Sequence, residues 1–404
     1  MMLKIIWRNI WRNKRRSLVM LSSVIVGVIA IILNDSFGNG FVEQMLTSQI
    51  NKHTSHIQIH KTGFVDNITI SSVIPDINKA ETVLKNNPSV VRYSKRIITF
   101  GLVNSANSSS GVNIVGIQPG TESQITVMKK SVIEGKYPES GKRDILIGSK
   151  MADKLEVGIG GKLVVVANSA QGTVNSELFR VSGIYKSGHS DFDNSYIFVP
   201  ADFANSLLEL NGNIHEFAII TNSIENIEQT KREIAEALGS GYEVLSYKDL
   251  LPMIVSYMEV YQSSIFIFYA IIGIAVLFGV VNTMLMSVFE RVPEFGVLIA
   301  IGMKRGTLFR MVLGESLVLG ILGSIIGSVL GLLIYLPFAK SGIDLSSFSE
   351  GMSMMGLDAI IYPSVNPMMF LNSTIVMPLT AVIGAVYPAY KAIRLQPTEA
   401  MRHV

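Results

Sequence analysis

The chain has 404 residues, of which 49% are hydrophobic and only 16% are charged, and its mean hydropathy is +0.40. Soluble domains carry roughly 25% charged residues, so this composition excludes a disordered chain and indicates a membrane protein. The absence of cysteine excludes disulfides, cysteine-ligated zinc, a thiol nucleophile and the acylated cysteine of a lipoprotein.

The charged residues are unevenly distributed along the chain. Of 65 Asp, Glu, Lys and Arg residues, 44 lie between Asp35 and Glu259, where 20 are basic and 24 are acidic. The flanking parts have 14 basic and 7 acidic residues, so their net charge is +7, against −4 for the segment between them. Because the basic excess lies beside apolar segments, it indicates membrane orientation, and no nucleic-acid partner is expected.

The N-terminal segment 1–16 is basic and has apolar residues at helical spacing, with Trp7 and Trp11 suited to the headgroup level of a bilayer. This pattern predicts an amphipathic helix on the inner leaflet, with an ordinary basic topogenic segment as the alternative. The apolar run that follows ends in Leu33, Asn34 and Asp35 without a small-residue cleavage site. It is therefore predicted to be an uncleaved anchor.

Four apolar runs are long enough to cross a bilayer, which takes about 20 helical residues. We expect the first helix at 17–49 and the second at 251–289, each extended outward by a stalk. The third is expected at 310–338 and the fourth at 368–390. The remaining segments are a cytoplasmic coupling helix, a short outer loop and a cytoplasmic tail, at 290–309, 339–367 and 391–404.

The distribution of basic residues predicts the orientation of these spans. Thirteen lie before the first span, between the second and third, or after the fourth, whereas the loop between the third and fourth has only Lys340. The positive-inside rule therefore predicts a multi-pass protein with both termini in the cytoplasm. The segment between the first two spans is then extracytoplasmic.

That segment, 50–250, has the patterns of a mixed α/β domain. The helical patterns 34–51 and 247–263 flank it and are expected to form the stalks. Strands and helices are expected at His56–His60, Lys162–Val166, Tyr196–Val199, Ile77–Lys85 and Ile224–Leu238. The expected fold class is an α-helical membrane protein with four transmembrane helices plus a large mixed α/β extracytoplasmic domain inserted between helices 1 and 2.

No catalytic or nucleotide-binding motif is present in the sequence. The stretch from Gly158 to Lys162 lacks the upstream glycine and the hydroxyl residue of a phosphate-binding loop, and it is predicted to be a turn before a strand. No serine has glycines at both −2 and +2, as the nucleophile of a hydrolase elbow would. We therefore expect a non-catalytic chain without a cofactor of its own.

Some residues are of types that bind metals or move protons. Glu315 lies inside the third span, where it either belongs to a proton relay or, as we favour, snorkels to the near end or pairs with a loop arginine. The histidine and aspartate groups lack a second ligand set with recognisable spacing, so surface or strand roles are favoured over a metal site. They comprise His53, His56, His60, His189, Asp191 and Asp193.

Small residues recur every four positions in the third span, at Gly323, Gly327 and Gly331. Such a row makes a smooth helical face against which another helix packs closely. Within this chain, spans four and two are the candidate partners.

The most informative motif runs from Asn282 to Gly302 and reads NTMLMSVFERVPEFGVLIAIG. It resembles the segment between spans two and three of permeases in the FtsX/MacB superfamily, also called type VII ABC transporters. The order of one span, a large outer domain and three further spans agrees along essentially the whole chain. The chain end is similar as well, at Pro388, Ala389, Ala392, Pro397, Ala400, Met401 and Arg402.

Within this superfamily, the outer domain is most similar to the lipoprotein-releasing permeases of the LolC/LolE type. Gln118 departs from the pattern, since an acidic residue is common at this position. The similar stretches are Phe37–Phe41, Ser55–Ile59, Val115–Pro119, Ile133–Lys136, Ile147–Ser149 and Val181–Ile184.

The resemblance implies a subunit of the bacterial inner membrane that works by mechanotransmission. A cytoplasmic ABC ATPase dimer, using ATP and Mg, would push the coupling helix, and spans one and two would move the outer domain. Two permease chains, the same or related, are expected for each ATPase dimer. The residues expected to couple to the ATPase are Glu290, Arg291, Glu294, Phe295, Gly296, Ala300 and Gly302.

The favoured function is extraction of lipoproteins from the outer leaflet of the inner membrane, for transfer to a periplasmic lipoprotein chaperone, with membrane lipids as further partners. The alternatives are MacB-type efflux of a peptide, toxin or drug from the periplasm and FtsX-type signalling to a cell-wall hydrolase. The residues expected, from position, to line a substrate cavity are Val24, Ile31, Phe41, Met45, Met258, Tyr261 and Ile265.

Overall fold

The computed structural model describes residues 2–354, 357 and 359–394, and the chain divides into two compact units. The helical unit comprises Met1–Glu43, Tyr257–Asp344 and Ile360–Val404, and the α/β unit comprises Gln44–Ser256 and Leu345–Ala359. Of the predicted tail 391–404, the part that contains Pro397, Ala400, Met401 and Arg402 lies outside the described residues.

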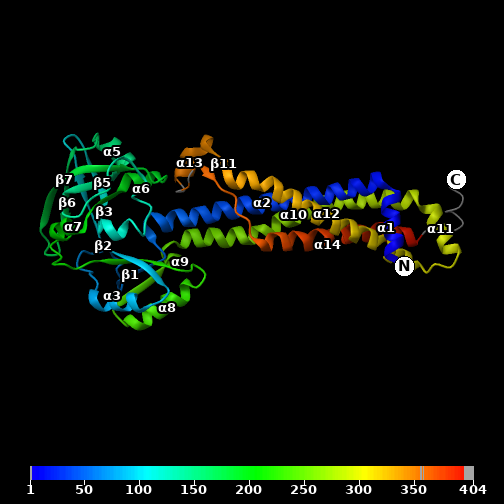
Figure 1. The fold of residues 1–404 in the computed structure, drawn as a ribbon, viewed down its shortest axis with the longest axis horizontal. Helices are drawn as coiled ribbons and strands as arrows, with labels where there is room; N and C mark the ends of the chain where they lie inside the picture. Colours follow the sequence, from blue (N-terminus) through cyan, green and yellow to red (C-terminus); the bar gives the residue numbers. More distant parts are fainter. Residues whose placement is uncertain (1, 355–356, 358, 395–404) are drawn as a thin grey trace. The chain divides into compact units, whose positions relative to one another are not determined.

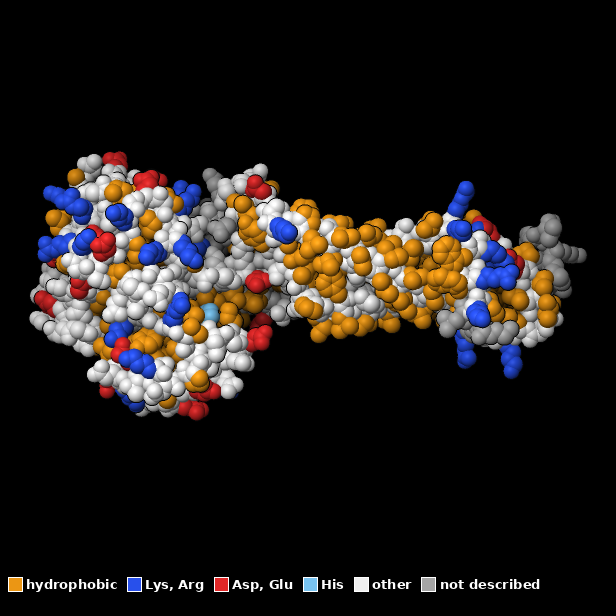
Figure 2. Space-filling view, in the orientation of Figure 1, with side chains coloured by type: hydrophobic (Ala, Val, Ile, Leu, Met, Phe, Trp, Pro, Cys, Tyr) orange, Lys and Arg blue, Asp and Glu red, His pale blue; other side chains and the backbone are white. Residues whose placement is uncertain are grey.

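The helical unit is built on four helices that are long and apolar enough to cross a membrane. Apolar side chains cover the length of this bundle, and basic side chains gather at the end that carries the short helices α1 and α11 (Figures 1 and 2). The prediction of four such helices is confirmed. The helices of the helical unit are α1 (Met2–Arg12), α2 (Lys14–Gln49), α10 (Pro252–Glu290), α11 (Val292–Ala300), α12 (Arg305–Ser341) and α14 (Pro367–Ile393). A small antiparallel pair of strands, β11 (Ile343–Asp344) and β12 (Ile360–Ile361), accompanies them.

The N-terminal segment forms the expected helix, but it is shorter than predicted. It ends at Arg12, and a turn at Asn13 separates it from α2, with the carbonyl of Asn13 accepting from the amides of Arg16 and Ser17. Lys14 and the two arginines after it therefore belong to the first turn of the long helix.

The second expected stalk, 247–263, is interrupted. A short helix, α9 (Tyr247–Leu250), ends at Leu251, where φ is −123° and ψ is 54°, and α10 starts at Pro252. Proline disfavours the helical conformation of the residue before it but is well accommodated in the first turn of a helix. This single residue divides the predicted helix into two.

The glycine face of α12 packs within this chain, against a helix that the sequence did not single out. A Cβ built on Gly323 lies 2.7 Å from Val24, and one built on Gly327 lies 2.8 Å from Val28, both on α2. Gly331 meets Ile32 in the same way at 3.0 Å. The expectation of span four or two is wrong for these three glycines, which face the first span.

The helix α14 lies against α12 along a neighbouring line. A Cβ on Gly320 falls 2.9 Å from the Cα of Pro378, and the Ser316 hydroxyl donates to the carbonyl of Ala381 at 2.6 Å. The α12 helix is therefore held between α2 and α14, and small residues bring it close to both.

The α/β unit contains one ten-stranded sheet in the order β10-β1-β9-β2-β3-β8-β5-β7-β4, with β6 paired to both β2 and β7. Strands β3 and β8 are parallel, as are β5 and β7, and the other pairs are antiparallel. The strands are β1 (Ile57–Lys61), β2 (Val90–Asn104), β3 (Ser109–Ile117), β4 (Val132–Gly135), β5 (Asp144–Gly148), β6 (Lys162–Asn168), β7 (Val174–Tyr185), β8 (Tyr196–Pro200), β9 (Glu216–Thr221) and β10 (Tyr242–Ser246).

Short helices cover this sheet, so the expected α/β domain is confirmed, together with the strands and helices proposed at five places. The amphipathic helices α3 and α8 pack on each other beside β2 and β10, and α7 covers β2 and β3 (Figure 1). These and the remaining helices are α3 (Ile77–Asn86), α4 (Pro119–Glu122), α5 (Ser149–Leu155), α6 (Ser190–Ser195), α7 (Ala201–Leu208), α8 (Ile227–Leu238) and α13 (Ser349–Met354), with a π-helical turn η1 (Ile50–Thr54) and a 3-10 turn η2 (Ser346–Phe348).

Candidate functional site

The segment expected to receive force from an ATPase forms the short helix α11. Its start follows from Pro293 in the first turn, a position that costs no hydrogen bond. Its end follows from Gly302, whose φ of +100° is readily adopted only by glycine. The nine-residue helix is therefore shorter than the predicted segment 290–309, and α12 begins five residues before the predicted span.

Only some of the predicted coupling residues lie on the surface of the helical unit. Glu290, Glu294, Ala300 and Gly302 are exposed. The other three predicted coupling residues do not reach this surface, because their side chains or backbone are buried within the chain. These are Arg291, Phe295 and Gly296.

Two apolar side chains other than Phe295 are exposed at this end of the unit. Val297 is 47% exposed and Ile301, just after α11, is 79% exposed. The buried Phe295 is an internal anchor, since the guanidinium of Arg291 lies 4.9 Å from its ring centre. The surface available to a partner is thus a small apolar patch, formed by Val297 and Ile301, beside two glutamates.

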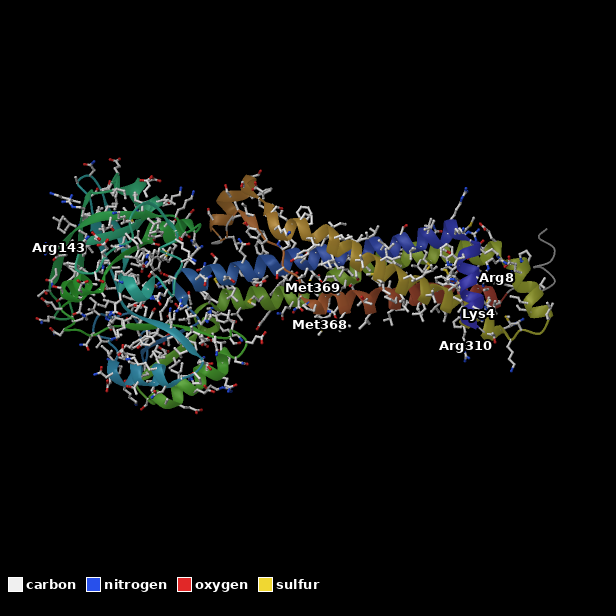
Figure 3. All side chains as sticks on the ribbon, viewed as in Figure 1. Lys4, Arg8, Arg143, Arg310, Met368 and Met369 are labelled. Atoms are coloured by element: carbon white, nitrogen blue, oxygen red, sulfur yellow. The ribbon has the colours of Figure 1, made fainter. Side chains whose placement is uncertain are left out.

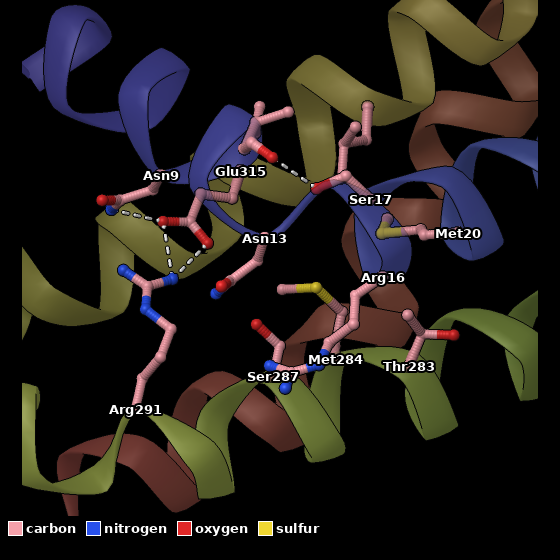
Figure 4. Close-up of a pocket in the computed structure, with 12 residues that line it drawn as sticks. Asn9, Asn13, Arg16, Ser17, Met20, Thr283, Met284, Ser287, Arg291 and Glu315 are labelled. Atoms are coloured by element: carbon pink, nitrogen blue, oxygen red, sulfur yellow. Dashed lines mark hydrogen bonds and ion pairs between the residues drawn. The ribbon is translucent and has the colours of Figure 1, made fainter.

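The buried arginine beneath α11 pairs with the carboxylate of the third span. The Nη1 atom of Arg291 donates to both carboxylate oxygens of Glu315, at 3.0 and 2.8 Å, and the side-chain amide of Asn9 donates to one of them at 2.8 Å (Figure 4). The interpretation that Glu315 pairs with a loop arginine is confirmed. A hydrogen-bonded pair compensates the high cost of burying either charge alone.

The two surface glutamates pair with arginines from the N-terminal part of the chain. Glu294 pairs with Arg12 at the end of α1, and Glu290 pairs with Arg16 in the first turn of α2. The Nε atom of Arg291 also donates to Glu294 at 3.4 Å. Arg12 and Arg16 were not identified from the sequence as partners of these glutamates, although the two arginines are four residues apart, as the two glutamates are.

These contacts tie one short helix to three others. From α11 and the end of α10, ion pairs reach α1, α2 and α12. Three of the paired residues, Arg16, Arg291 and Glu315, line a small polar pocket together with Asn13, Thr283 and Ser287 (Figure 4). A displacement of α11 must either break the buried ion pair of Arg291 and Glu315 or carry α12 with it, whereas the links to α1 and α2 are partly exposed ion pairs. The arrangement is suited to passing on a mechanical displacement.

The residues expected to line a substrate cavity lie in different environments. Val24 and Ile31 are completely buried in the bundle, so the expectation is wrong for these two. The others retain exposed surface: Phe41, Met45, Met258, Tyr261 and Ile265.

The α/β unit contains a second buried ionic cluster, which the sequence did not reveal. Arg96 on β2 is fully buried and donates to Glu122 at 2.7 Å, to Glu216 at 2.7 Å and to the carbonyl of His53 at 2.5 Å. Both carboxylates are buried too. Burial opposes the charge of Arg96, but Glu122 and Glu216 outweigh that effect and raise its pKa above the ordinary value. The cluster joins β2, α4, β9 and η1.

Burial shifts the pKa values of the acidic and histidine side chains in and around this cluster. It raises the pKa of Glu216 to about 7 in spite of Arg96, and it lowers the pKa of His60 to about 4 and that of His53 to about 3. His60 is therefore neutral near pH 7, so its 3.6 Å approach to Glu216 is not an ion pair there.

Three of the histidine and aspartate residues considered above accept hydrogen bonds from backbone amides. His189 accepts from the amide of Phe192 at the start of α6, and Asp193 accepts from the amide of Ser187 at 3.0 Å. His56 accepts from the amide of Thr221 at 3.1 Å. Within residues 2–354, 357 and 359–394, no group of three or more His, Asp or Glu side chains is arranged to hold a metal ion.

The chain matches two protein families along most of its length. Residues 17–237 match the family described as MacB-like periplasmic core domain, and residues 265–397 match the family described as FtsX-like permease C-terminal. The first match alone covers more than half of the 404 residues.

Three relatives extend these matches to nearly the whole chain. The lipoprotein-releasing system transmembrane protein LolC of Neisseria meningitidis is 22% identical, covering 96% of this chain and 94% of the relative. LolC of Xylella fastidiosa is 20% identical, covering 97% and 96%. The pyoverdine export ATP-binding/permease protein PvdT of Pseudomonas fluorescens is 25% identical over 98% of this chain, which spans 58% of that relative.

Proposed function

Because this chain belongs to the FtsX/MacB superfamily and is a permease subunit of an ABC transporter, we propose that it couples a separate ATPase to movement of its α/β unit. ATP and Mg would bind to that ATPase, in keeping with the lack of a phosphate-binding loop in this sequence. Two permease chains, identical or related, would work with one ATPase dimer. The chain itself transmits displacement and carries out no chemistry.

The observation that carries this proposal is the attachment of α11 to its neighbours. Val297 and Ile301 give an ATPase an apolar contact, and the paired glutamates give it a charged rim. Force applied there reaches α12 through Arg291 and Glu315 and reaches α2 through Glu290 and Arg16. Both the first and second spans continue beyond the bundle, since α2 and α10 extend into the α/β unit.

We propose that the end of the bundle with α1 and α11 lies in the cytoplasm of a bacterium, at its inner membrane, with the α/β unit in the periplasm. Lys4, Arg8 and Arg310 lie together at that end (Figure 3). Clustered basic residues favour the cytoplasmic side of a membrane. The two termini would then be cytoplasmic.

Cysteine labelling tests this orientation, since the natural chain has no cysteine. Ile301→Cys in intact cells is expected to resist a membrane-impermeant maleimide, whereas Val174→Cys on β7, where the side chain is 70% exposed, is expected to react. Labelling of Ile301→Cys without cell lysis would contradict the orientation. Lysed cells in which both positions react provide the control for accessibility.

Cross-linking tests the contact with the ATPase. A cysteine reagent on Ile301→Cys is expected to capture the ATPase, in a yield that changes when ATP is added. Leu333→Cys is the matched control, because it is 57% exposed on α12 but lies in the apolar part of the bundle. Equal capture from both positions, or none from Ile301→Cys, would refute the coupling role.

For the substrate, we propose lipoproteins, extracted from the outer leaflet of the inner membrane and passed to a periplasmic chaperone. The near-complete mutual coverage with proteins named as lipoprotein-releasing supports this class. Phe41, Met258, Tyr261 and Ile265 would contact the acyl chains. A charged Ile265→Asp variant is expected to retain lipoproteins in the inner membrane while its own insertion and ATPase binding persist.

Mass spectrometry of the complex purified from native membranes distinguishes this substrate class from the alternatives. Acylated lipoproteins together with an ATPase are the expected result. An adaptor protein with an outer-membrane channel would support efflux of a peptide, toxin or drug, as the export role in the name of PvdT suggests for that relative. A cell-wall hydrolase would support signalling. Either of these results would contradict lipoprotein release.

A further inference from the structure

A groove runs along the outside of the helical unit where α1, α2 and α12 meet. It has a volume of about 360 Å³, within the range of roughly 300–1,000 Å³ typical of small-molecule sites. Two of its lining residues, Ile10 and Leu319, are at most 8% exposed and form its floor. The other lining residues include Trp7, Trp11, Lys14, Leu322 and Ile326.

The groove is apolar except at one side. The hydroxyl of Ser17 donates to the carbonyl of Ile10 at 2.9 Å, so it is already used within the chain. Among the described residues that line the groove, Lys14 is the one charged group, and its Nζ atom lies 5.7 Å from the ring centre of Trp11. No carboxylate is among these described lining residues. The groove thus combines an apolar channel with a positive charge at its rim.

The side chains at the rim of the groove are of the types found at the headgroup level of a bilayer. Trp7 and Trp11 are each about half exposed, and their rings meet edge to face with centres 6.0 Å apart. Tryptophan at a helix end and lysine beside it are typical of the membrane interface. Lys4 and Arg8 project from the same short helix (Figure 3), but they line a separate depression. An apolar channel with a basic residue at this level suits an anionic lipid headgroup.

We propose that this groove binds an anionic glycerophospholipid of the cytoplasmic leaflet, with one acyl chain along Leu322 and Leu319 and the phosphate at Lys14. Charge complementarity selects this occupant, since a second apolar helix would leave Lys14 at the contact without an anionic partner. The lipid would brace α1 against α2 and α12, beside the ion pairs that hold α11. The inference rests on the proposed orientation but not on the substrate or the ATPase.

Photolabelling tests the site in the complete complex, reconstituted in proteoliposomes of phosphatidylethanolamine and phosphatidylglycerol. A phosphatidylglycerol probe with a diazirine in its acyl chain is expected to label the peptide that contains Leu319, Leu322 and Ile326. Leu322→Trp, which fills the groove, is expected to abolish that label. Leu333→Trp, on the exposed surface of the same helix, is the matched control and is expected to keep it.

Competition experiments test the headgroup preference. Lys14→Ala is expected to weaken phosphatidylglycerol labelling about fivefold, the effect of one basic residue near an anionic membrane surface. It is expected to weaken labelling by a phosphatidylethanolamine probe less, because the ammonium group of that lipid offsets the charge of its phosphate. Lys4→Ala, outside the groove lining, is the charge-matched control. Equal labelling of the two lipids by the natural protein, or equal loss in the two tryptophan variants, would overturn the proposal.

Two further results separate this inference from the proposed function. Capture of a protein by a photoreactive residue at Leu322, in place of lipid, would show that the groove is a protein interface and would also overturn the proposal. Failure of Ile301→Cys to capture an ATPase would remove the coupling role while leaving the lipid label unchanged. The two sets of experiments therefore fail independently.

Discussion

A buried arginine held by two glutamates occurs in each of the two units, and the difference between these clusters is informative. In the α/β unit, both partners of Arg96 are buried with it. In the helical unit, Arg291 has one buried partner, Glu315, and one exposed partner, Glu294, which also binds Arg12. The Arg96 cluster is closed and holds strands in place, whereas the Arg291 cluster extends to the surface where force is proposed to arrive.

The largest expected effect comes from opening the closed cluster. Arg96→Met would leave Glu122 and Glu216 buried without a cation, which costs about 3–5 kcal/mol of the free energy of unfolding. Hydrogen exchange in the full-length protein is expected to show strands β2 and β9 losing protection. Arg92→Met, an exposed position on the same strand, is the matched control, and an equal effect of both variants would refute a structural role for the cluster.

Removing the ion pair of the Arg291 cluster tests whether stability and coupling to the ATPase can be separated. Arg291→Met is expected to cost about 3 kcal/mol, the lower end for a broken buried pair, because the exposed partner Glu294 is left in water. Adding Glu315→Met is expected to restore stability, since an apolar pair often replaces a buried ion pair without loss. Melting can be followed through the two tryptophans, both of which lie on α1.

The double variant is expected to remain uncoupled, so that the complex hydrolyses ATP without releasing substrate. Replacing Arg96, Glu122 and Glu216 together by apolar residues provides the comparison. When this variant regains stability, it is also expected to regain ATP-driven release. A fully coupled Arg291→Met, Glu315→Met protein would show that the ion pair only stabilises the bundle.

The pH dependence of stability gives a smaller and more specific test of the closed cluster. The folded-state pKa values of His53 and His60 are lowered to about 3 and 4, so their contribution to stability grows as pH rises toward 6.5. The pKa of Glu216 is raised to about 7, so its contribution is lost as pH rises from about 4.5 to 7. Burial also lowers the pKa of His215 and of His56, which lie at the ends of β9 and β1, so the histidines outweigh the glutamate and stability is expected to rise between about pH 4.5 and 6.5.

Hydrogen exchange of β1 and β9, corrected for the intrinsic pH dependence of exchange, measures this slope, with α12 peptides as an internal reference. Glu216→Gln removes the opposing contribution and is expected to make the rise with pH steeper. A flat profile in the natural protein, or a shallower one in Glu216→Gln, would be inconsistent with this assignment.

The smallest effect on stability is expected at the exposed ion pairs. Arg12→Glu and Glu294→Arg are each expected to change the free energy of unfolding by about 0–1 kcal/mol, as is usual for surface pairs. Each single variant should nevertheless weaken ATP-driven release, and the charge-swapped double variant should restore it in part, because an arginine at position 294 still faces Arg291. Arg15→Glu, an exposed residue outside the pair, controls for net charge, and a double variant no better than the singles would argue against the contact.

The sequence was sufficient to predict the order of the helices and domains. Four apolar runs, the clustering of basic residues and the motif around Glu290 to Gly302 predicted the helices, the α/β insertion and the family. Each of these signals is a local one, such as a run of apolar residues or a motif on one segment. Proline and glycine also mark their own positions, yet the break at Leu251 was missed because the helical pattern continues on both sides of it.

Tertiary structure alone decided which residues of the motif face outward. Arg291 and Phe295 look like partner contacts in the sequence, but they are buried because α11 packs on α12 and on the N-terminal segment. The pairing of Glu294 with Arg12, and of Arg96 with Glu122, joins residues far apart in the chain. A sequence pattern records which groups are charged or apolar, whereas their partners depend on how helices and strands pack in space.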